Sequence, residues 1–102
     1  MQQSVRIAAV LFTLTAQSAL AQDRAAIEAG TEIYATNCSP CHGERLANPG
    51  GIPDLKQLKA GDRAKFDATV IDGKGQMPPW EGTLNEEEIG QIWAYIRSKA
   101  DN

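Results

Sequence analysis

The sequence is poor in the side chains from which most metal and thiol sites are built. Its 102 residues include one histidine, two cysteines and two methionines, one of which is Met1. A zinc site needs four ligands, or three ligands and a water molecule. The cysteines and the histidine of this chain all lie within residues 38–42, and such crowding does not suit a tetrahedral site.

Clusters of positive charge and strand patterns are also missing. The formal net charge is −3, with 10 basic and 13 acidic residues. Contacts with phosphates require clustered lysine and arginine, so nucleic acid is not expected as a partner. No run alternates apolar and polar residues over the length of a strand, and we therefore predict an all-α protein.

The cysteines and the histidine form one pentapeptide, Cys38-Ser39-Pro40-Cys41-His42. This spacing is typical of c-type haem attachment, in which each thiol adds to one haem vinyl group and the histidine binds the iron. A thioredoxin-like Cys-x-x-Cys pair follows a strand and opens a helix, and no such strand is predicted here. The motif predicts one covalent haem c, attached through Cys38 and Cys41, with His42 as an iron ligand.

The first 21 residues have the pattern of a cleaved secretory signal peptide. Arg6 supplies the positive charge, Ile7 to Leu14 is a mostly apolar run, and Ala19-Leu20-Ala21 fits a cleavage site before Gln22. The apolar run is too short to span a bilayer. We expect a periplasmic protein, exported by a bacterium, whose one domain is residues 22–102. An uncleaved membrane anchor is the alternative.

The predicted mature chain is small. Removing 21 of 102 residues leaves 81, and because Arg6 is the only charge removed, the remaining 9 basic and 13 acidic residues give a formal charge of −4. A core of this size is marginal, and haem attachment would use both cysteines, so no disulfide could support it. We therefore predict that the chain folds poorly without its haem.

Apolar periodicity predicts a first and a last helix. The first runs from Asp23, its expected N-cap, to about Asn37, with an inward stripe at Ile27, Gly30, Ile33 and Tyr34. A glycine inside a helix costs about 1 kcal/mol relative to alanine, and we expect another helix to cross closely at Gly30. The last helix runs from Asn85 to about Lys99 and begins with an Asn85/Glu88 cap. Its apolar face is formed by Ile89, Ile92, Trp93 and Ile96, with Tyr95 beside it.

A middle helix and the loop after it complete the pattern. Asp62 is the expected N-cap of the middle helix, and Gly73 is placed to end it. Its apolar side is formed by Phe66, Val70 and Ile71.

Met77 lies in a loop with glycine before it and two prolines after it. Because His42 is the only histidine, two histidine ligands from one chain are excluded. The second axial position is then taken by Met77, left open or bound to water, or occupied by a lysine or a terminal amine. A metal-bound histidine usually directs its other nitrogen to a carbonyl or carboxylate. The Pro53 carbonyl is the candidate partner of His42, although an ordinary loop proline is the alternative.

The order of these features resembles that of the class I monohaem cytochromes c. The resemblance covers nearly all of residues 24–100. It implies a small fold of three to four helices around one covalent haem, with the first and last helices crossing. By this resemblance Met77 is the second iron ligand, Pro53 is the partner of His42, and Ile92 and Tyr95 face Gly30 and Tyr34.

Two segments are more specifically similar to cytochromes that serve quinoprotein (PQQ-dependent) alcohol dehydrogenases. These are Gly51-Ile52-Pro53-Asp54-Leu55 and Met77-Pro78-Pro79-Trp80. The lysine-rich surface of the mitochondrial members is absent, so their mode of docking is not carried over.

The resulting functional hypothesis is a monomeric one-electron carrier and not an enzyme. It would pass electrons from a periplasmic dehydrogenase to a terminal oxidase or another acceptor in a respiratory chain. Three rivals remain: a haem protein with an open distal site for ligand binding, sensing or weak peroxidase activity, a haem-free thiol–disulfide oxidoreductase, and a subunit of a dehydrogenase complex.

Overall fold

The computed structural model describes the backbone of residues 2–100 and the side chains of residues 19–100. Its helices are α1 (Gln2–Asn37), α2 (Ser39–His42), α3 (Arg63–Asp72) and α4 (Glu86–Lys99). Three short 3-10 turns, η1 (Glu44–Leu46), η2 (Leu55–Gln57) and η3 (Ala60–Asp62), lie between α2 and α3. Within residues 2–100 there is no strand beyond a single bridge between Lys74 and Met77, and the predicted all-α class is confirmed.

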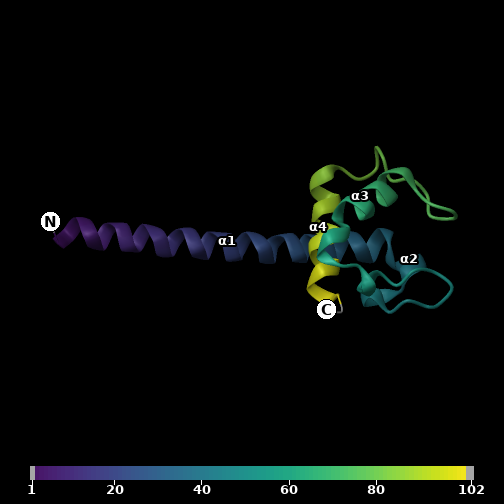
Figure 1. Cartoon of the computed structure of the whole chain (residues 1–102), viewed down its shortest axis with the longest axis horizontal. Coiled ribbons are helices and arrows are strands. Elements are labelled where there is room, and N and C mark those ends of the chain that lie inside the picture. The colour runs from purple at the N-terminus through teal and green to yellow at the C-terminus, as the bar shows by residue number, and fades with distance from the viewer. Residues whose placement is uncertain (1, 101–102) are drawn as a thin grey trace.

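The crossing of α1 and α4 organises the fold (Figure 1). Gly30 is buried at this crossing, and a Cβ atom there would collide with the carbonyl of Gln91 and lie 3.0 Å from the Ile92 nitrogen. One turn further along, the rings of Tyr34 and Tyr95 pack with centroids 5.2 Å apart. The predicted close approach at Gly30 is therefore confirmed, since no larger residue leaves room for the main chain of α4.

The start of the first helix differs from the prediction. Asp23 was expected to cap it, but α1 already begins at Gln2 and runs through Asp23 without a break. Residues 2–22 contain no proline or glycine and many strong helix formers, so nothing interrupts the helix before Asp23. In Figure 1 this part of α1 projects as a rod from the rest of the fold, and the extents of the chain, rod included, are 65 × 29 × 24 Å.

With 36 residues, α1 is longer than a helix needs to be to span a bilayer. Within the part of the chain that the structure describes, no helix combines the length and the apolar character needed to cross a membrane.

The ends of α3 confirm one prediction and correct another. Gly73 ends the helix with φ +78°, and its N–H donates to the Thr69 carbonyl at 2.8 Å. The Asp62 side chain, however, makes no capping hydrogen bond to α3. It accepts instead from the Lys59 N–H at 2.8 Å. Asp62 is also the last residue of η3, and its carboxylate caps the start of that turn.

The capping box at the start of α4 is confirmed. The Asn85 side chain accepts from the Glu88 N–H at 2.8 Å, and the Glu88 carboxylate accepts from the Asn85 N–H at 3.0 Å. Near the other end of the helix, Arg97 donates to the Leu58 carbonyl at 2.8 Å and ties α4 to the segment between η2 and η3.

The core lies between α1, α3 and α4. Phe66 of α3 meets Trp93 of α4 with ring centroids 5.1 Å apart, and Ile96 is fully buried. All the apolar residues predicted for the inner face of α4 are buried, and the core as a whole consists of Tyr34, Leu46, Phe66, Val70, Leu84, Ile89, Ile92, Trp93, Tyr95 and Ile96.

Candidate haem site

The end of α1 leads directly into the haem pentapeptide. The Cys38 N–H donates to the Tyr34 carbonyl at 2.8 Å, and the His42 N–H donates to the Cys38 carbonyl at 2.9 Å. Pro40 stands in the first turn of α2, where its missing N–H costs no helical hydrogen bond. A single helical turn therefore brings Cys38, Cys41 and His42 together, as the sequence motif predicts.

The chain around Gly43 is held by hydrogen bonds that the carbonyls of His42 and Gly43 accept. The Tyr34 hydroxyl donates to the Gly43 carbonyl at 2.7 Å, and the Asn48 N–H donates to the His42 carbonyl at 3.0 Å. Arg45 and Leu46 adopt left-handed backbone conformations, with φ of 54° and 63°. Sequence reasoning missed this turn, because neither residue type favours that conformation. Leu46 is almost fully buried, and its packing into the core accounts for the turn.

Burial shifts the pKa of two side chains of the pentapeptide, Cys38 and His42. It raises the pKa of Cys38 to about 11, so this thiol is neutral at physiological pH. A thioredoxin-like pair needs a thiolate and lowers the pKa of its attacking cysteine, so the arrangement disfavours that rival. Burial also lowers the pKa of His42, which favours the neutral imidazole, the form that binds metal ions.

Because Tyr34 is buried, we predict that the free energy of unfolding falls at alkaline pH. Burial raises its pKa from 10.0 to about 12, so its contribution is complete below pH 10 and is lost as the pH rises towards 12. Each pKa unit corresponds to about 1.4 kcal/mol. Because part of the shift comes from the charge of Cys38, which does not ionise once it is bound to haem, the expected loss is at most about 3 kcal/mol. Denaturant unfolding of the haem-loaded protein across this pH range measures it. In Tyr34→Phe the free energy of unfolding should fall less steeply as the pH rises. A smaller part of the fall should remain, because burial also raises the pKa of Tyr95. An unchanged slope would contradict the assignment of the alkaline loss to Tyr34.

Pro53 lies in the loop between η1 and η2 and is exposed. Its neighbours are well anchored, since the Ile52 carbonyl accepts from the Asn48 side chain at 3.2 Å and the Asp54 carboxylate caps η2 through the Lys56 N–H at 3.0 Å. The proposed hydrogen bond between His42 and the Pro53 carbonyl stays a prediction.

The loop that carries Met77 is braced by main-chain bonds. Lys74 and Met77 exchange two backbone hydrogen bonds of 3.0 Å, and the Trp80 N–H donates to the Val70 carbonyl at 2.9 Å. Gly73 is closely enclosed, because a Cβ atom there would lie 2.7 Å from the Met77 carbonyl oxygen and 2.8 Å from the Pro79 nitrogen. The position of Met77 therefore depends on the absence of a side chain at Gly73.

Replacing Gly73 with alanine should displace the Met77 loop. The φ of +78° with ψ of 169° is a conformation essentially restricted to glycine, and the added Cβ would meet main-chain atoms. We expect the variant to lose much of the far-red absorption of a sulfur-ligated ferric haem. Gly75→Ala is the matched control, since Gly75 has φ +59° and open space around it, and should cost only about 1–2 kcal/mol. Equal spectra of the two variants would contradict this role of Gly73.

Apolar side chains that pack on the core but stay partly exposed come from both segments of the candidate site. Leu55 and Leu58 follow the pentapeptide, while Met77 and Trp80 belong to the braced loop. Both segments lie on the side of the α1–α4 crossing away from the N-terminus (Figure 1). Such half-covered apolar surface fits a flat apolar ligand, so the residues present suit a haem held by Cys38, Cys41 and His42.

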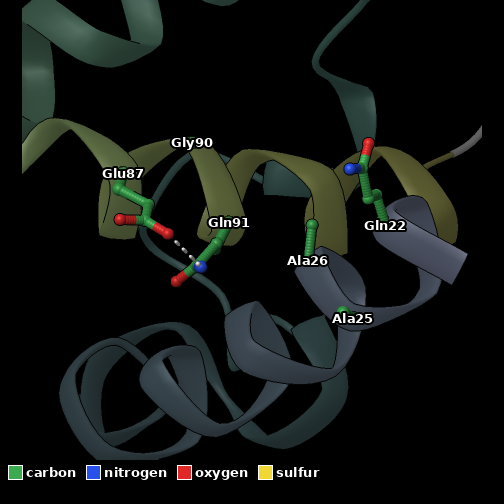
Figure 2. Close-up of a pocket in the computed structure, with 6 residues that line it drawn as sticks. All are labelled: Gln22, Ala25, Ala26, Glu87, Gly90 and Gln91. Carbon is green, nitrogen blue, oxygen red and sulfur yellow. Dashed lines mark hydrogen bonds between the residues drawn. The ribbon is translucent and has the colours of Figure 1, made fainter. Parts of the chain in front are cut away.

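Two pockets among the described residues are not lined by Cys38, Cys41, His42 or Met77. One is a shallow depression along α1 and α4, lined by Gln22, Ala25, Ala26, Glu87, Gly90 and Gln91 (Figure 2). A second is lined by Thr31, Tyr34, Ala35, Ser39, Glu44, Arg45 and Tyr95. Among the described residues, no cluster of three or more histidine, cysteine, aspartate or glutamate side chains could hold a free metal ion.

Comparisons with known proteins agree with this site. Residues 25–96 match the family described as "Cytochrome C oxidase, cbb3-type, subunit III". Cytochrome c6 of Euglena viridis is 36% identical over 78 residues, which cover 70% of this chain and 90% of that protein. No solved structure matches the chain significantly.

Other relatives are larger proteins of which the chain covers a small part. Quinohemoprotein alcohol dehydrogenase ADH IIB of Pseudomonas putida is 36% identical over 76 residues, 72% of this chain but 11% of that protein. The cbb3-type cytochrome c oxidase subunit FixP of Bradyrhizobium sp. (strain ORS 278) is 38% identical over 76 residues, 69% of this chain and 26% of that protein. Given the haem motif, the crossing helices and these matches, the chain belongs to the class I cytochromes c and carries a c-type haem.

Proposed function

We propose that the protein is an exported bacterial one-electron carrier whose haem iron is bound by His42 and Met77. The observation that supports this proposal is that the sequence has one histidine and, outside the predicted signal, one methionine, and that main-chain hydrogen bonds brace the segment on which each lies. The haem supplies one-electron chemistry by cycling between ferric and ferrous iron. The chain itself makes and breaks no substrate bond.

The residues around the site suit a carrier. Cys38 and Cys41 keep the cofactor attached while the protein leaves one partner for the next. Methionine sulfur favours ferrous iron and raises the reduction potential. The partly buried Leu55 and Trp80 add an apolar surrounding, which disfavours the charge of the ferric centre.

The comparisons support a place for the carrier between a dehydrogenase and an oxidase. Similar segments form part of a quinohemoprotein alcohol dehydrogenase and of a cbb3-type oxidase subunit. A relative of nearly the same length is a cytochrome c6. We therefore propose a free periplasmic monomer that takes electrons from a dehydrogenase, of which the PQQ-dependent class is a candidate, and passes them to a terminal oxidase.

A redox titration of the exported protein tests the carrier function. We expect a single reversible one-electron step and slow, weak binding of carbon monoxide to the ferrous form, because Met77 fills the sixth position. Rapid carbon monoxide binding would favour the rival with an open distal site. Stable co-purification with a dehydrogenase would instead identify a subunit of that complex.

A further inference from the structure

We propose that Gln22 is converted to pyroglutamate once the signal peptide is removed, so that the mature protein has a blocked N-terminus. This inference depends on the proposed cleavage between Ala21 and Gln22. It assigns a modification to a residue that the electron-transfer site does not use.

The structure leaves the chain around Gln22 exposed to solvent. Residues 19–25 are exposed, and Ala26 is the first side chain of α1 beyond them that is partly buried. Gly30, about one turn beyond Ala26, is the first of residues 19–30 that is fully buried. Cleavage before Gln22 would therefore leave a new terminus that projects about one helical turn beyond the packed part of α1 (Figure 1).

The side chain of Gln22 is also uncommitted. Figure 2 shows its amide directed away from Glu87 and Gln91, which interact with each other through a Gln91 N–H donated to Glu87 at 3.5 Å. Among the described residues, the Gln22 amide is therefore not held by either polar side chain that lines the same depression. It is free to turn back towards its own amine.

The reaction needs no oxidant, reductant or co-substrate. The α-amino nitrogen attacks the side-chain amide carbon of the same residue, and a new carbon–nitrogen bond closes a lactam ring. The bond from that carbon to the amide nitrogen breaks, and the proton lost by the amine leaves with this nitrogen as ammonia. Because nucleophile and electrophile belong to one residue, the reaction has the advantage of proximity.

Cleavage of the signal supplies the nucleophile. In the uncleaved chain the nitrogen of Gln22 is an amide inside the continuous helix α1, and an amide nitrogen does not react in this way. After cleavage it becomes an amine in the first turn of the shortened helix, where N–H groups have no partner within the helix. An ammonium at the positive end of a helix is also disfavoured, and the uncharged lactam relieves this repulsion.

The mass of the exported, haem-loaded protein tests the proposal. We expect the mass of residues 22–102 with one haem, reduced by one ammonia, together with resistance to stepwise N-terminal sequencing. Treatment with pyroglutamyl aminopeptidase should remove one residue and expose Asp23. The lactam should also make the protein more acidic by one charge in isoelectric focusing.

Gln22→Ala is the matched control, since alanine also tolerates an exposed position at the terminus but has no side-chain amide. It should retain its full mass and a free amine, which excludes ammonia loss at another site. A wild-type protein that begins at Gln22 and keeps its amine after prolonged incubation at neutral pH would overturn the modification while leaving the signal cleavage intact. A different N-terminus would overturn the cleavage and, with it, this inference.

Discussion

Replacing Gly30 with alanine is expected to lower the free energy of unfolding of the haem-loaded protein by about 3 kcal/mol or more, at or beyond the upper end of overpacking effects. The reason is that the new Cβ would collide with the Gln91 carbonyl and approach the Ile92 nitrogen. Main-chain atoms cannot move aside as a flexible side chain can, so α1 and α4 would have to separate. Denaturant unfolding followed by far-UV circular dichroism measures the loss.

Gly90→Ala is the matched control for this prediction. Gly90 also lies inside a helix at the same interface, but a Cβ there would meet only the end of the Arg63 side chain, at 3.3 Å. Alanine is the better helix former by about 1 kcal/mol, so Gly90→Ala should change stability by no more than about 1 kcal/mol. Equal losses in the two variants would contradict the assignment of Gly30 as the contact point of the crossing.

Replacing Met77 with alanine should convert the carrier into a ligand-binding haem protein. We expect the far-red sulfur-to-iron band of the ferric form to disappear and carbon monoxide to bind the ferrous form rapidly. The reduction potential should fall by about 0.1 V or more, within the range of about 0.8 V that axial ligands control. Optical spectra and a redox titration of the exported variant measure these changes.

Gln76→Ala controls for disturbance of the loop, since Gln76 is exposed and adjacent to Met77. This variant should keep the band and the potential of the wild type. A Met77→Ala protein with an unchanged ferric spectrum and potential would show that Met77 does not bind the iron, and the sixth position would then be open, bound to water, or occupied by a lysine or a terminal amine.

The features that sequence analysis predicted correctly depend on local chemistry or on a pattern repeated along one helix. The Cys38–His42 motif fixes its own geometry, because residues three and four apart share one helical turn. The Asn85/Glu88 cap is likewise local. Gly30 was predicted for a different reason, since a glycine within a strong apolar stripe indicates a close contact with another element.

The features that were predicted wrongly or missed depend on competition between neighbouring segments. Asp62 was assigned to α3, but the preceding turn η3 uses its carboxylate first. Asp23 was assigned as a helix start, although the upstream residues continue the same helix. The left-handed turn at Arg45 and Leu46 has no local signal, since it follows from burying Leu46 in the core.

Gly73 shows how much of the candidate site a sequence can indicate. Its role as a helix end was predicted from its place after an apolar run. Its second role, making room for the main chain of Met77 and Pro79, appears only when the loop is folded back against α3. The candidate iron ligands could thus be proposed from the sequence, but the contacts that hold the Met77 loop in place could not.

The optical spectrum of the exported protein, taken in the ferric and ferrous forms with a pyridine haemochrome of the denatured sample, tests the central claim most directly. The account predicts haem c together with a far-red sulfur-to-iron band in the ferric form. Haem c without that band would contradict the ligation by Met77 and favour a ligand-binding function. Absence of covalent haem, from a host able to attach it, would contradict the whole account and return Cys38 and Cys41 to thiol chemistry.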